Sequence, residues 1–323
     1  MKQIKEYDSS NEDNSRIVSE PQTDWGGPWT ERKLNAFEKY VKAYLTIMKN
    51  HASENGWKLF YFDAFAGSGS RELVTGKGSS TKESLFAEEE IELITKQSSY
   101  KGAAERVLGI EGFTFDYYYF VDKNAESLQS LKKKLETRFP HKAKYMAFKQ
   151  GDANEKILDL VNYAKNNPKC AALVLLDPFG MQLNWETIQS LKEIKHIDLW
   201  ILIPSGVIIN RLLTRNGEIM CPDRMEKLFG MSVNEIKEHF YQQVTEPGLF
   251  GKIILQQKRD NTIHRIAQLY LKLLGNEFAH VIKEPLVLRN TTNCPIFHFV
   301  FASHNKTGVK IASEIVRHIN RER

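Results

Sequence analysis

Residues 60–70 read FYFDAFAGSGS, an apolar run that ends in an aspartate and enters a turn with two glycines. Such a turn lets the backbone approach a ligand closely, because glycine has no Cβ to collide with it. It is not a nicotinamide fingerprint, since Glu72 stands where the third glycine of G-x-G-x-x-G belongs, and no Gly-Lys-Ser/Thr follows to make a P-loop. A tight strand-to-helix turn without a ligand is the alternative interpretation.

Short apolar runs alternate along the chain with segments that have the spacing of amphipathic helices. The five apolar runs are 59–64, 115–121, 144–148, 171–176 and 199–203. The helical segments between them are 85–94, 125–138, 155–164 and 185–194, and an earlier helix is expected from Thr30, as its cap, to Met48. Strands that alternate with helices indicate right-handed crossovers and a parallel sheet covered on both faces.

The last third of the chain departs from this alternation. Residues 207–258 are expected to form a helical and irregular insertion, followed by a helix over 262–274 that ends at Gly275. Two apolar runs, 279–288 and 295–302, are joined by the polar turn RNTTNC, which predicts an antiparallel hairpin. Parallel strands with a late antiparallel pair differ from a dinucleotide-binding dehydrogenase, whose sheet is parallel to its end.

We therefore predict an α/β protein with a Rossmann-like parallel sheet, a C-terminal antiparallel hairpin, helices on both faces and a helical insertion after strand five. Residues 25–323 are expected to form a single domain, and the polar, aperiodic residues 1–24 a disordered arm. Trp25, Trp29 and Tyr40 are candidates for a lid over a ligand, with core packing as the alternative.

Composition limits the class of protein. The chain has 45 Lys and Arg against 40 Asp and Glu, a net charge of +5 and a pI near 8.8, which permits a phosphate-bearing partner without requiring one. Its three cysteines are far apart and belong to no C-x-x-C pair or histidine cluster, so neither a metal site nor a disulfide framework is expected. No signal-peptide core or stretch of roughly 20 apolar residues is visible, so we expect a cytoplasmic protein without a membrane partner.

Two further strand ends carry acidic residues. Asp122 closes the second apolar run and is followed by Lys123, and Asp152 follows the third run and precedes Ala153. Open α/β sheets bind ligands beyond the carboxyl ends of their strands, so both positions are candidates for a ligand site. A cap on the following helix is the alternative for each aspartate.

The stretch from Asp63 to Gly69 resembles the D-x-F-x-G-x-G signature of adenine- and guanine-type amino methyltransferases. The resemblance implies a class I methyltransferase fold that holds S-adenosylmethionine, with Asp63 on its ammonium, Asp122 on the ribose hydroxyls and Asp152 on the adenine amino group. The residues assigned to the cofactor in this way are Asp63, Phe65, Ala66, Gly67, Gly69, Asp122, Lys123, Asp152 and Ala153.

The fourth run ends in Asp177, Pro178 and Phe179, which resemble the Asp/Asn-Pro-Pro-aromatic motif of methyltransferases acting on exocyclic amines. In that motif the carboxylate and a following carbonyl accept the amine hydrogens while the aromatic ring stacks on the base, so these three residues are the catalytic candidates. The sequence departs from the motif, because Phe179 replaces the second proline and Gly180 stands where the aromatic belongs. An ordinary strand-end turn is the alternative.

Over residues 25–320 the chain resembles the three-Cys-motif partner protein family. The resemblance is carried by WTERKLNAFEKYVKAYLTIM, DAFAGSGS, VDKN, GDAN, LDPFGM and RNTTNCPIFHFVFASHNKTGVKIA. It implies a class I methyltransferase-like fold and a partner with a three-cysteine, radical-enzyme-like motif. The family name describes that neighbour, so the cysteines of this chain are not part of the resemblance.

Basic residues and histidines supply weaker candidates. Arg211, Arg215 and Arg224 lie in the insertion after strand five and are candidates for contacts to substrate phosphates, with ordinary surface charge as the alternative. The lysines and arginine of 132–144 are expected to form a solvated face away from the pocket. His298 and His304 are expected on the substrate side, either as acid–base candidates or as structural residues.

The sequence supports three hypotheses. The first is an S-adenosylmethionine-dependent methyltransferase acting on an exocyclic amine of a nucleobase in DNA or RNA. The second is a non-catalytic or partner-dependent interaction protein that serves the three-cysteine-motif protein. The third is methylation of a protein or a small molecule, for which the arginines are incidental.

Overall fold

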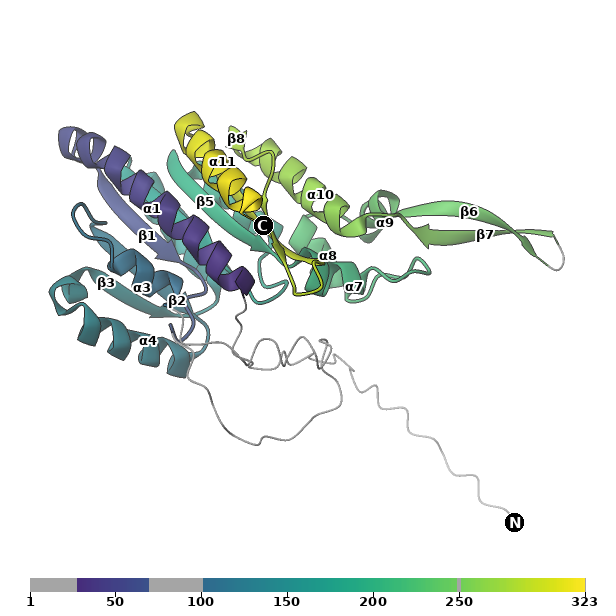
Figure 1. The fold of residues 1–323 in the computed structure, drawn as a ribbon, viewed down its shortest axis with the longest axis horizontal. Helices are drawn as coiled ribbons and strands as arrows, with labels where there is room; N and C mark the ends of the chain where they lie inside the picture. Colours follow the sequence, from purple (N-terminus) through teal and green to yellow (C-terminus); the bar gives the residue numbers. More distant parts are fainter. Residues whose placement is uncertain (1–27, 70–100, 249–250, 323) are drawn as a thin grey trace, which may run out of the picture.

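A computed structural model describes residues 28–69, 101–248 and 251–322. The expected arm at 1–24, Trp25 and the helix predicted over 85–94 lie outside the described residues. Figure 1 shows a twisted central sheet with helices packed on its faces and a two-stranded hairpin that projects from the body.

The central sheet is parallel except at one end, as predicted. Its strand order is β3-β2-β1-β4-β5-β10-β8, and β9 also pairs with β10, on the side away from β5. The parallel strands are β1 (Lys58–Asp63), β2 (Tyr117–Asp122), β3 (Met146–Gln150), β4 (Cys170–Leu176) and β5 (His196–Ile203). The antiparallel strands are β8 (His280–Val281), β9 (Leu286–Arg289) and β10 (Pro295–Ser303). This confirms the Rossmann-like fold with its late antiparallel hairpin.

Four of the five predicted runs became strands that are largely buried, whereas β3 at the edge of the sheet is only partly buried. β4 has the sequence CAALVLL and is buried at all seven positions, which suits a central strand covered on both faces. The β9–β10 turn closes with a hydrogen bond from the N–H of Asn290 to the carbonyl of Cys294 at 3.0 Å. The Asn290 side chain accepts from the N–H of Cys294 at 2.8 Å, which stabilises the predicted hairpin.

The helices lie on both faces of the sheet. They include α1 (Pro28–Asn55), α3 (Ala103–Leu108), α4 (Ala125–Arg138), α5 (Ala153–Asn166), α6 (Trp185–Ser190), α10 (Thr262–Glu277) and α11 (Lys306–Arg321). α1 packs beside α11 and α3 on one face (Figure 1). Aromatic rings fill the space beneath α1, where Trp200 of β5 stacks on Phe299 of β10 with ring centroids 4.6 Å apart.

The start of α1 and the end of α10 differ from the sequence prediction, and one helix was missed. The described part of α1 begins at Pro28, so Thr30 lies inside the first turn and is not its cap; proline suits a first turn because it has no N–H to satisfy there. α10 continues through Gly275 to Glu277. Gly275 is solvent exposed within the helix, and the buried Phe278 follows the last turn. α11 was not predicted at all.

The sequence prediction for the insertion after β5 is wrong in one respect, because it includes no strands. The insertion contains α7 (Asn210–Leu212), α8 (Pro222–Phe229) and α9 (Val233–Phe240), but also a hairpin of β6 (Tyr241–Gly248) and β7 (Gly251–Lys258). A two-stranded ribbon has no sheet or helix covering it, so no alternation of buried and exposed residues marks its strands. In the part of the chain that the structure describes, we find no helix suited in length and hydropathy to span a bilayer.

Candidate cofactor and acceptor site

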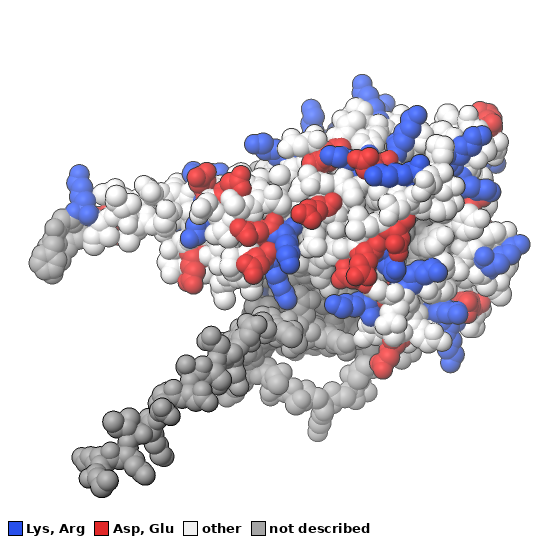
Figure 2. Space-filling model, turned by 180° about the vertical axis from the view of Figure 1, so that it is seen from behind, with Lys and Arg blue, Asp and Glu red and all other residues white. Residues whose placement is uncertain are grey.

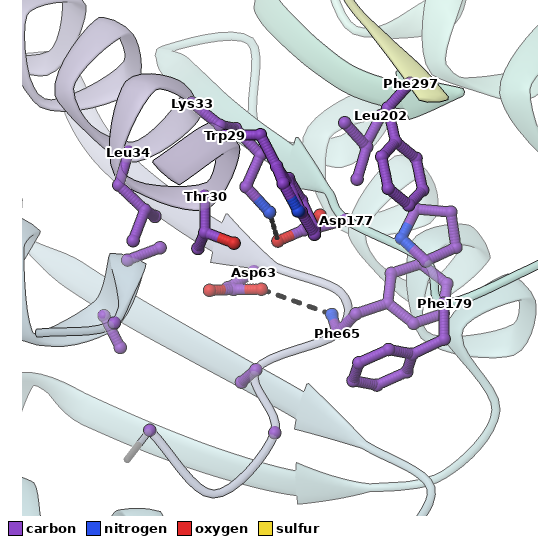
Figure 3. A pocket seen from close by; sticks show the side chains of 17 residues that line it. Trp29, Thr30, Lys33, Leu34, Asp63, Phe65, Asp177, Phe179, Leu202 and Phe297 are labelled. Atoms are coloured by element: carbon purple, nitrogen blue, oxygen red, sulfur yellow. Dashed lines mark hydrogen bonds and ion pairs between the residues drawn. The ribbon is translucent and has the colours of Figure 1, made fainter. Parts of the chain in front are cut away.

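A pocket lies at the carboxyl ends of β1 and β4 and beside the first turns of α1 (Figure 3). Its described walls come from α1, the glycine turn after β1, the start of α3, the turn after β4, Leu202 of β5 and Phe297 of β10. The pocket brings together two groups predicted separately from the sequence. These are the glycine-turn residues Asp63, Phe65, Ala66, Gly67 and Gly69, and the strand-end residues Asp177, Pro178 and Phe179.

The glycine turn needs glycine at both positions, for different reasons. Gly67 and Gly69 have φ of +59° and +67°, a conformation that side chains with a Cβ rarely adopt. A Cβ on Gly69 would approach Leu131 of α4 to 2.2 Å, whereas one on Gly67 would meet nothing within 4 Å. The turn is therefore packed tightly against α4 at Gly69, while Gly67 leaves open space at the pocket wall.

Asp63 is a buried carboxyl group at the end of β1. Its side chain accepts from the Tyr61 hydroxyl at 3.1 Å and from the N–H of Phe65 at 3.2 Å. Burial raises the pKa of Asp63 to about 7, and the charge of Asp177 adds to the rise. A carboxyl group of this kind is easily ionised by a cation placed beside it.

Asp122 is turned toward the backbone of the site. Its Oδ2 accepts from the N–H of Gly67 at 2.8 Å, and its Oδ1 accepts from the N–H of Asn124 at 2.7 Å. It thus joins the end of β2 to the glycine turn, and each oxygen retains a second lone pair for a ligand. Neither Asp122 nor the exposed Lys123 is among the described residues that line the pocket.

Asp152 caps α5, which is the alternative that the sequence left open. Its Oδ1 accepts from the backbone and side-chain nitrogens of Asn154, both at 2.9 Å. Asn154 in turn contacts the carbonyl of Gln182 and the N–H of Asn184, in the segment that follows the β4 turn. Asp152 and the buried Ala153 therefore organise the loops at this edge and do not line the described pocket.

Sequence reasoning missed Lys33, which reaches the pocket from α1. Its Nζ lies 2.5 Å from Oδ2 of Asp177 and 5.7 Å from the ring centroid of Trp29 (Figure 3). Trp29, Lys33 and Phe37 follow one another at four-residue steps on the buried side of α1. A lysine within an otherwise apolar stripe is the signal that would have found this residue.

Aromatic rings line the pocket beside the turn after β4. Phe179 is 41% exposed, and its N–H donates to the side chain of Gln182 at 3.0 Å. Trp29 is buried against Phe297, with ring centroids 4.8 Å apart, so it is a wall of the pocket that also belongs to the core. Tyr40 is not a lid residue, because it is buried and donates to Asp198 at 2.7 Å.

The predicted arginine contacts remain untested. Arg211 on α7, Arg215 after it and Arg224 on α8 are all exposed, and none is among the described pocket-lining residues. Phosphate binding by these arginines stays a prediction.

The expectation for the basic segment 132–144 is wrong in part. Lys134 pairs with the buried Glu105 at 2.7 Å and donates to the carbonyl of Gly69 at 2.6 Å, and Arg138 also pairs with Glu105. Lys142 donates to the carbonyls of Leu108 and Ile110. Part of this segment therefore supports the glycine turn and α3, because a buried glutamate on α3 attracts its charges.

The two histidines have different positions. His298 is buried with its Nδ1 2.6 Å from the hydroxyl of Ser205, and burial lowers its pKa to about 4, so the imidazole is neutral near pH 7. His304 follows Ser303 at the far end of β10, where its Nδ1 accepts from the N–H of Ala279 at 3.3 Å. The placement of His304 on the substrate side was wrong. β10 runs antiparallel to β5, so it ends near the amino end of β5, away from the pocket.

Comparison with known proteins gives structural likenesses at low sequence identity. No protein-family model matches this chain, and no curated protein matches it significantly. It is similar to the solved structure of LPL1258 from Legionella pneumophila, of the DUF519 family, at 15% identity over 87% of this chain and 98% of that one, with a TM-score of 0.39.

Two other similar structures are described as methyltransferases. A putative methyltransferase, YhhF from Escherichia coli, shares 14% identity over 67% of this chain and 84% of its own, with a TM-score of 0.25. The DszA carbon methyltransferase shares 12% identity over 82% and 52%, with a TM-score of 0.36. The strand order and the pocket therefore carry the functional argument.

Proposed function

We propose that this chain is an S-adenosylmethionine-dependent methyltransferase that acts on an exocyclic amine of a nucleobase in DNA or RNA. One observation carries the proposal: the Asp63 glycine turn and the Asp177–Phe179 turn line the same pocket. Methyl transfer needs a donor and an acceptor held in line, and a shared pocket allows that positioning.

The residues at the glycine turn fit the cofactor. Asp63 offers a buried acceptor for an ammonium group, Gly67 leaves space for a ligand beside the backbone, and Asp122 retains lone pairs for hydroxyl groups. When bound there, S-adenosylmethionine supplies an electrophilic methyl group on a sulfonium. Asp63 and the glycine turn would hold that ligand in place.

The turn after β4 fits an amine acceptor. Lys33 contacts Oδ2 of Asp177, and Oδ1 accepts no hydrogen bond from the described residues, so it is available to an amine N–H. Phe179 presents a half-exposed ring at the mouth, on which a planar base can stack. An amine held by Asp177 points its lone pair away from the carboxylate, and the carboxylate stabilises the positive charge that develops on nitrogen.

A nucleic-acid substrate is supported by the basic residues of one segment. The charge of the surface as a whole does not add to that support. Arg211, Arg215 and Arg224 are exposed on the insertion that follows β5. Elsewhere acidic and basic residues are interspersed, as Figure 2 shows for the face seen from behind. We therefore assign phosphate contacts to these three arginines alone.

A second candidate function is that of a partner-dependent protein serving a three-cysteine-motif protein. The observation that favours it is the β6–β7 hairpin, which extends from the body in Figure 1 and is mostly uncharged, with Glu246, Lys252 and Lys258 as the charged residues of its strands. Ile253, Ile254 and Leu255 are 50%, 67% and 43% exposed on it. Ile253 and Leu255 lie on one face of the ribbon and Ile254 on the other. Exposed large apolar side chains that gather in one segment are typical of a protein-binding surface.

Titration calorimetry tests the proposed function first. S-adenosylmethionine and S-adenosylhomocysteine are titrated into the wild-type protein and into Asp63→Ala, with Asp159→Ala, an exposed site on α5, as control. We expect binding that is lost in Asp63→Ala alone. Labelled methyl transfer to DNA and RNA is then measured with wild type and Asp177→Ala.

The outcomes separate the two candidate functions. Transfer to nucleic acid that depends on Asp177 supports the methyltransferase. The partner-dependent function is supported if the protein alone binds the cofactor but transfers no methyl group, and transfer begins only when the three-cysteine-motif protein is added. A folded protein that binds neither cofactor nor product contradicts the first proposal.

A further inference from the structure

Lys134 on α4 contacts two segments that both contribute to the pocket wall. Its Nζ donates to the carbonyl of Gly69 at 2.6 Å and lies 2.7 Å from Oε2 of Glu105 on α3. Gly69 and the first two residues of α3 line the pocket, whereas Lys134 itself is not among the described lining residues. One ammonium group outside the pocket therefore joins two parts of its wall.

Gly69 is enclosed from two sides at this contact. Leu131 of α4 leaves no room for a Cβ on Gly69, and an atom added to Gly102 would lie 3.4 Å from the carbonyl oxygen of Gly69. Leu131 and Lys134 are three residues apart, so α4 presents an apolar and a cationic group to the turn from one face. A half-buried carbonyl group needs a donor, and the ammonium of Lys134 fixes the direction in which this one points.

The buried carboxylate of Glu105 explains why the lysine is held in this place. The side chain of Glu105 is 2% exposed, and a carboxylate in such a position costs free energy unless cations compensate for it. Lys134 and Arg138, one turn apart on α4, are its ion-pair partners among the described residues. Of these two cations, Lys134 is the one that also donates to the glycine turn.

We propose that Lys134 is a positioning residue for the cofactor site, which orients the peptide group of Gly69 and so shapes the turn that holds the ligand. This inference rests on the proposed function, in which that ligand is S-adenosylmethionine. Asp122 binds the N–H of Gly67 from the end of β2, and Lys134 binds the carbonyl of Gly69 from α4. A turn held at both glycines is shaped before the ligand arrives, which lowers the ordering cost of binding.

Two substitutions separate positioning from ion pairing in general. Lys134→Met and Arg138→Met each leave Glu105 with one cationic partner. The first substitution alone also removes the donor to Gly69. Lys134→Arg keeps the positive charge and N–H donors. S-adenosylhomocysteine is titrated into wild type and the three variants, and thermal melts establish that each protein is folded.

A second measurement reports on the turn without any ligand. Amide hydrogen exchange of the segment 64–69 is followed by mass spectrometry in wild type and in the same variants. This segment contains the N–H of Gly67 that donates to Asp122, so a change in the shape of the turn alters its exchange rate.

We expect Lys134→Met to weaken the binding of S-adenosylhomocysteine roughly 3- to 30-fold, as the loss of one charge-assisted hydrogen bond predicts. Exchange in the turn should become faster in this variant. Arg138→Met should bind within about 2-fold of wild type and keep the wild-type exchange, because its half-exposed ion pair contributes little. Lys134→Arg should retain most of the affinity, since the guanidinium can donate to the same carbonyl.

Two results would overturn the inference. If Lys134→Met and Arg138→Met weaken the ligand equally, the lysine serves only the charge of Glu105. If Lys134→Met keeps both the affinity and the exchange rate of wild type, the turn holds its shape without this contact. Failure of the proposed function is recognised separately, because a folded wild type would then bind neither cofactor nor product, while hydrogen exchange still compares the variants.

Discussion

The N–H of Gly67 donates to Oδ2 of Asp122 across 2.8 Å, and this bond ties the glycine turn after β1 to the end of β2. The other oxygen of Asp122 receives the N–H of Asn124 at the start of α4. One carboxylate therefore shapes the site from two sides before any ligand is present. Substitution of Asp122 should therefore change both the stability of the turn and the affinity for the cofactor.

Asp122→Ala should lower both stability and cofactor affinity. It leaves two backbone donors without their acceptor, which costs about 1–3 kcal/mol each when such groups are buried, and less here because Asp122 is only half-buried. Asp122→Asn keeps one acceptor oxygen and should have an intermediate effect. Denaturant unfolding and titration of S-adenosylhomocysteine measure the two effects. A variant with wild-type stability would show that the turn holds its shape without this bond.

Gly69→Ala should destabilise the protein by about 1–3 kcal/mol, because its Cβ would approach Leu131 to 2.2 Å at a φ of +67°. Gly275→Ala is the matched control, since it lies in α10 with nothing within 4 Å of the added atom. That change should be neutral or stabilising by up to about 1 kcal/mol. Urea midpoints of both variants check the prediction. Equal midpoints would mean that the turn adjusts without cost.

Cofactor binding should strengthen as pH rises toward 7. The pKa of Asp63 is raised to about 7 by burial and by Asp177, so the group is largely protonated at pH 5 and accepts an ammonium well only after ionising. The same shift means that its contribution to folding stability is fully present below its unfolded pKa and is lost as pH rises through about 7. Asp63→Asn should flatten both profiles. Calorimetry and thermal melts across this pH range measure them.

The exposed arginines predict a particular salt dependence. If Arg211, Arg215 and Arg224 contact phosphates, each change to Ala should reduce the slope of log K against log salt by about 1. Lys310→Ala, at an exposed position on α11, is the control and should leave the slope unchanged. Fluorescence anisotropy with labelled single-stranded and duplex oligonucleotides gives these slopes. Unchanged slopes in all three variants would assign the arginines to ordinary surface charge.

Ile254→Lys should leave stability within about 0.5 kcal/mol of wild type, because this side chain is 67% exposed opposite Thr245. It should nevertheless abolish binding to a three-cysteine-motif protein if the β6–β7 hairpin is the contact surface. Ile47→Lys, at an exposed position on α1, introduces the same charge elsewhere and should bind normally. Co-purification of the two proteins provides the measurement. Equal loss in both variants would point to an effect of charge alone.

The strands and the glycine turn were predictable because their signals are local. β1 to β5 are short apolar stretches that end in acidic or turn residues, and a parallel sheet places those ends at one edge. Asp63 and Asp177 follow from that rule without knowledge of any contact. The β6–β7 hairpin escaped prediction because Ile253 and Ile254 are exposed on opposite faces, so burial imposes no pattern on it.

The sequence by itself determined the five parallel strands, the late hairpin of β9 and β10, the glycine turn and the acidic strand ends, because each depends on neighbouring residues. Only the tertiary structure decided which side chains meet. Lys33 reaches Asp177 across 144 positions of sequence, and Lys134 reaches the carbonyl of Gly69 across 65. Asp122 likewise reaches the N–H of Gly67 across 55 positions. Such pairings depend on how α1 and α4 pack on the sheet, and no local pattern encodes the distance between two packed elements.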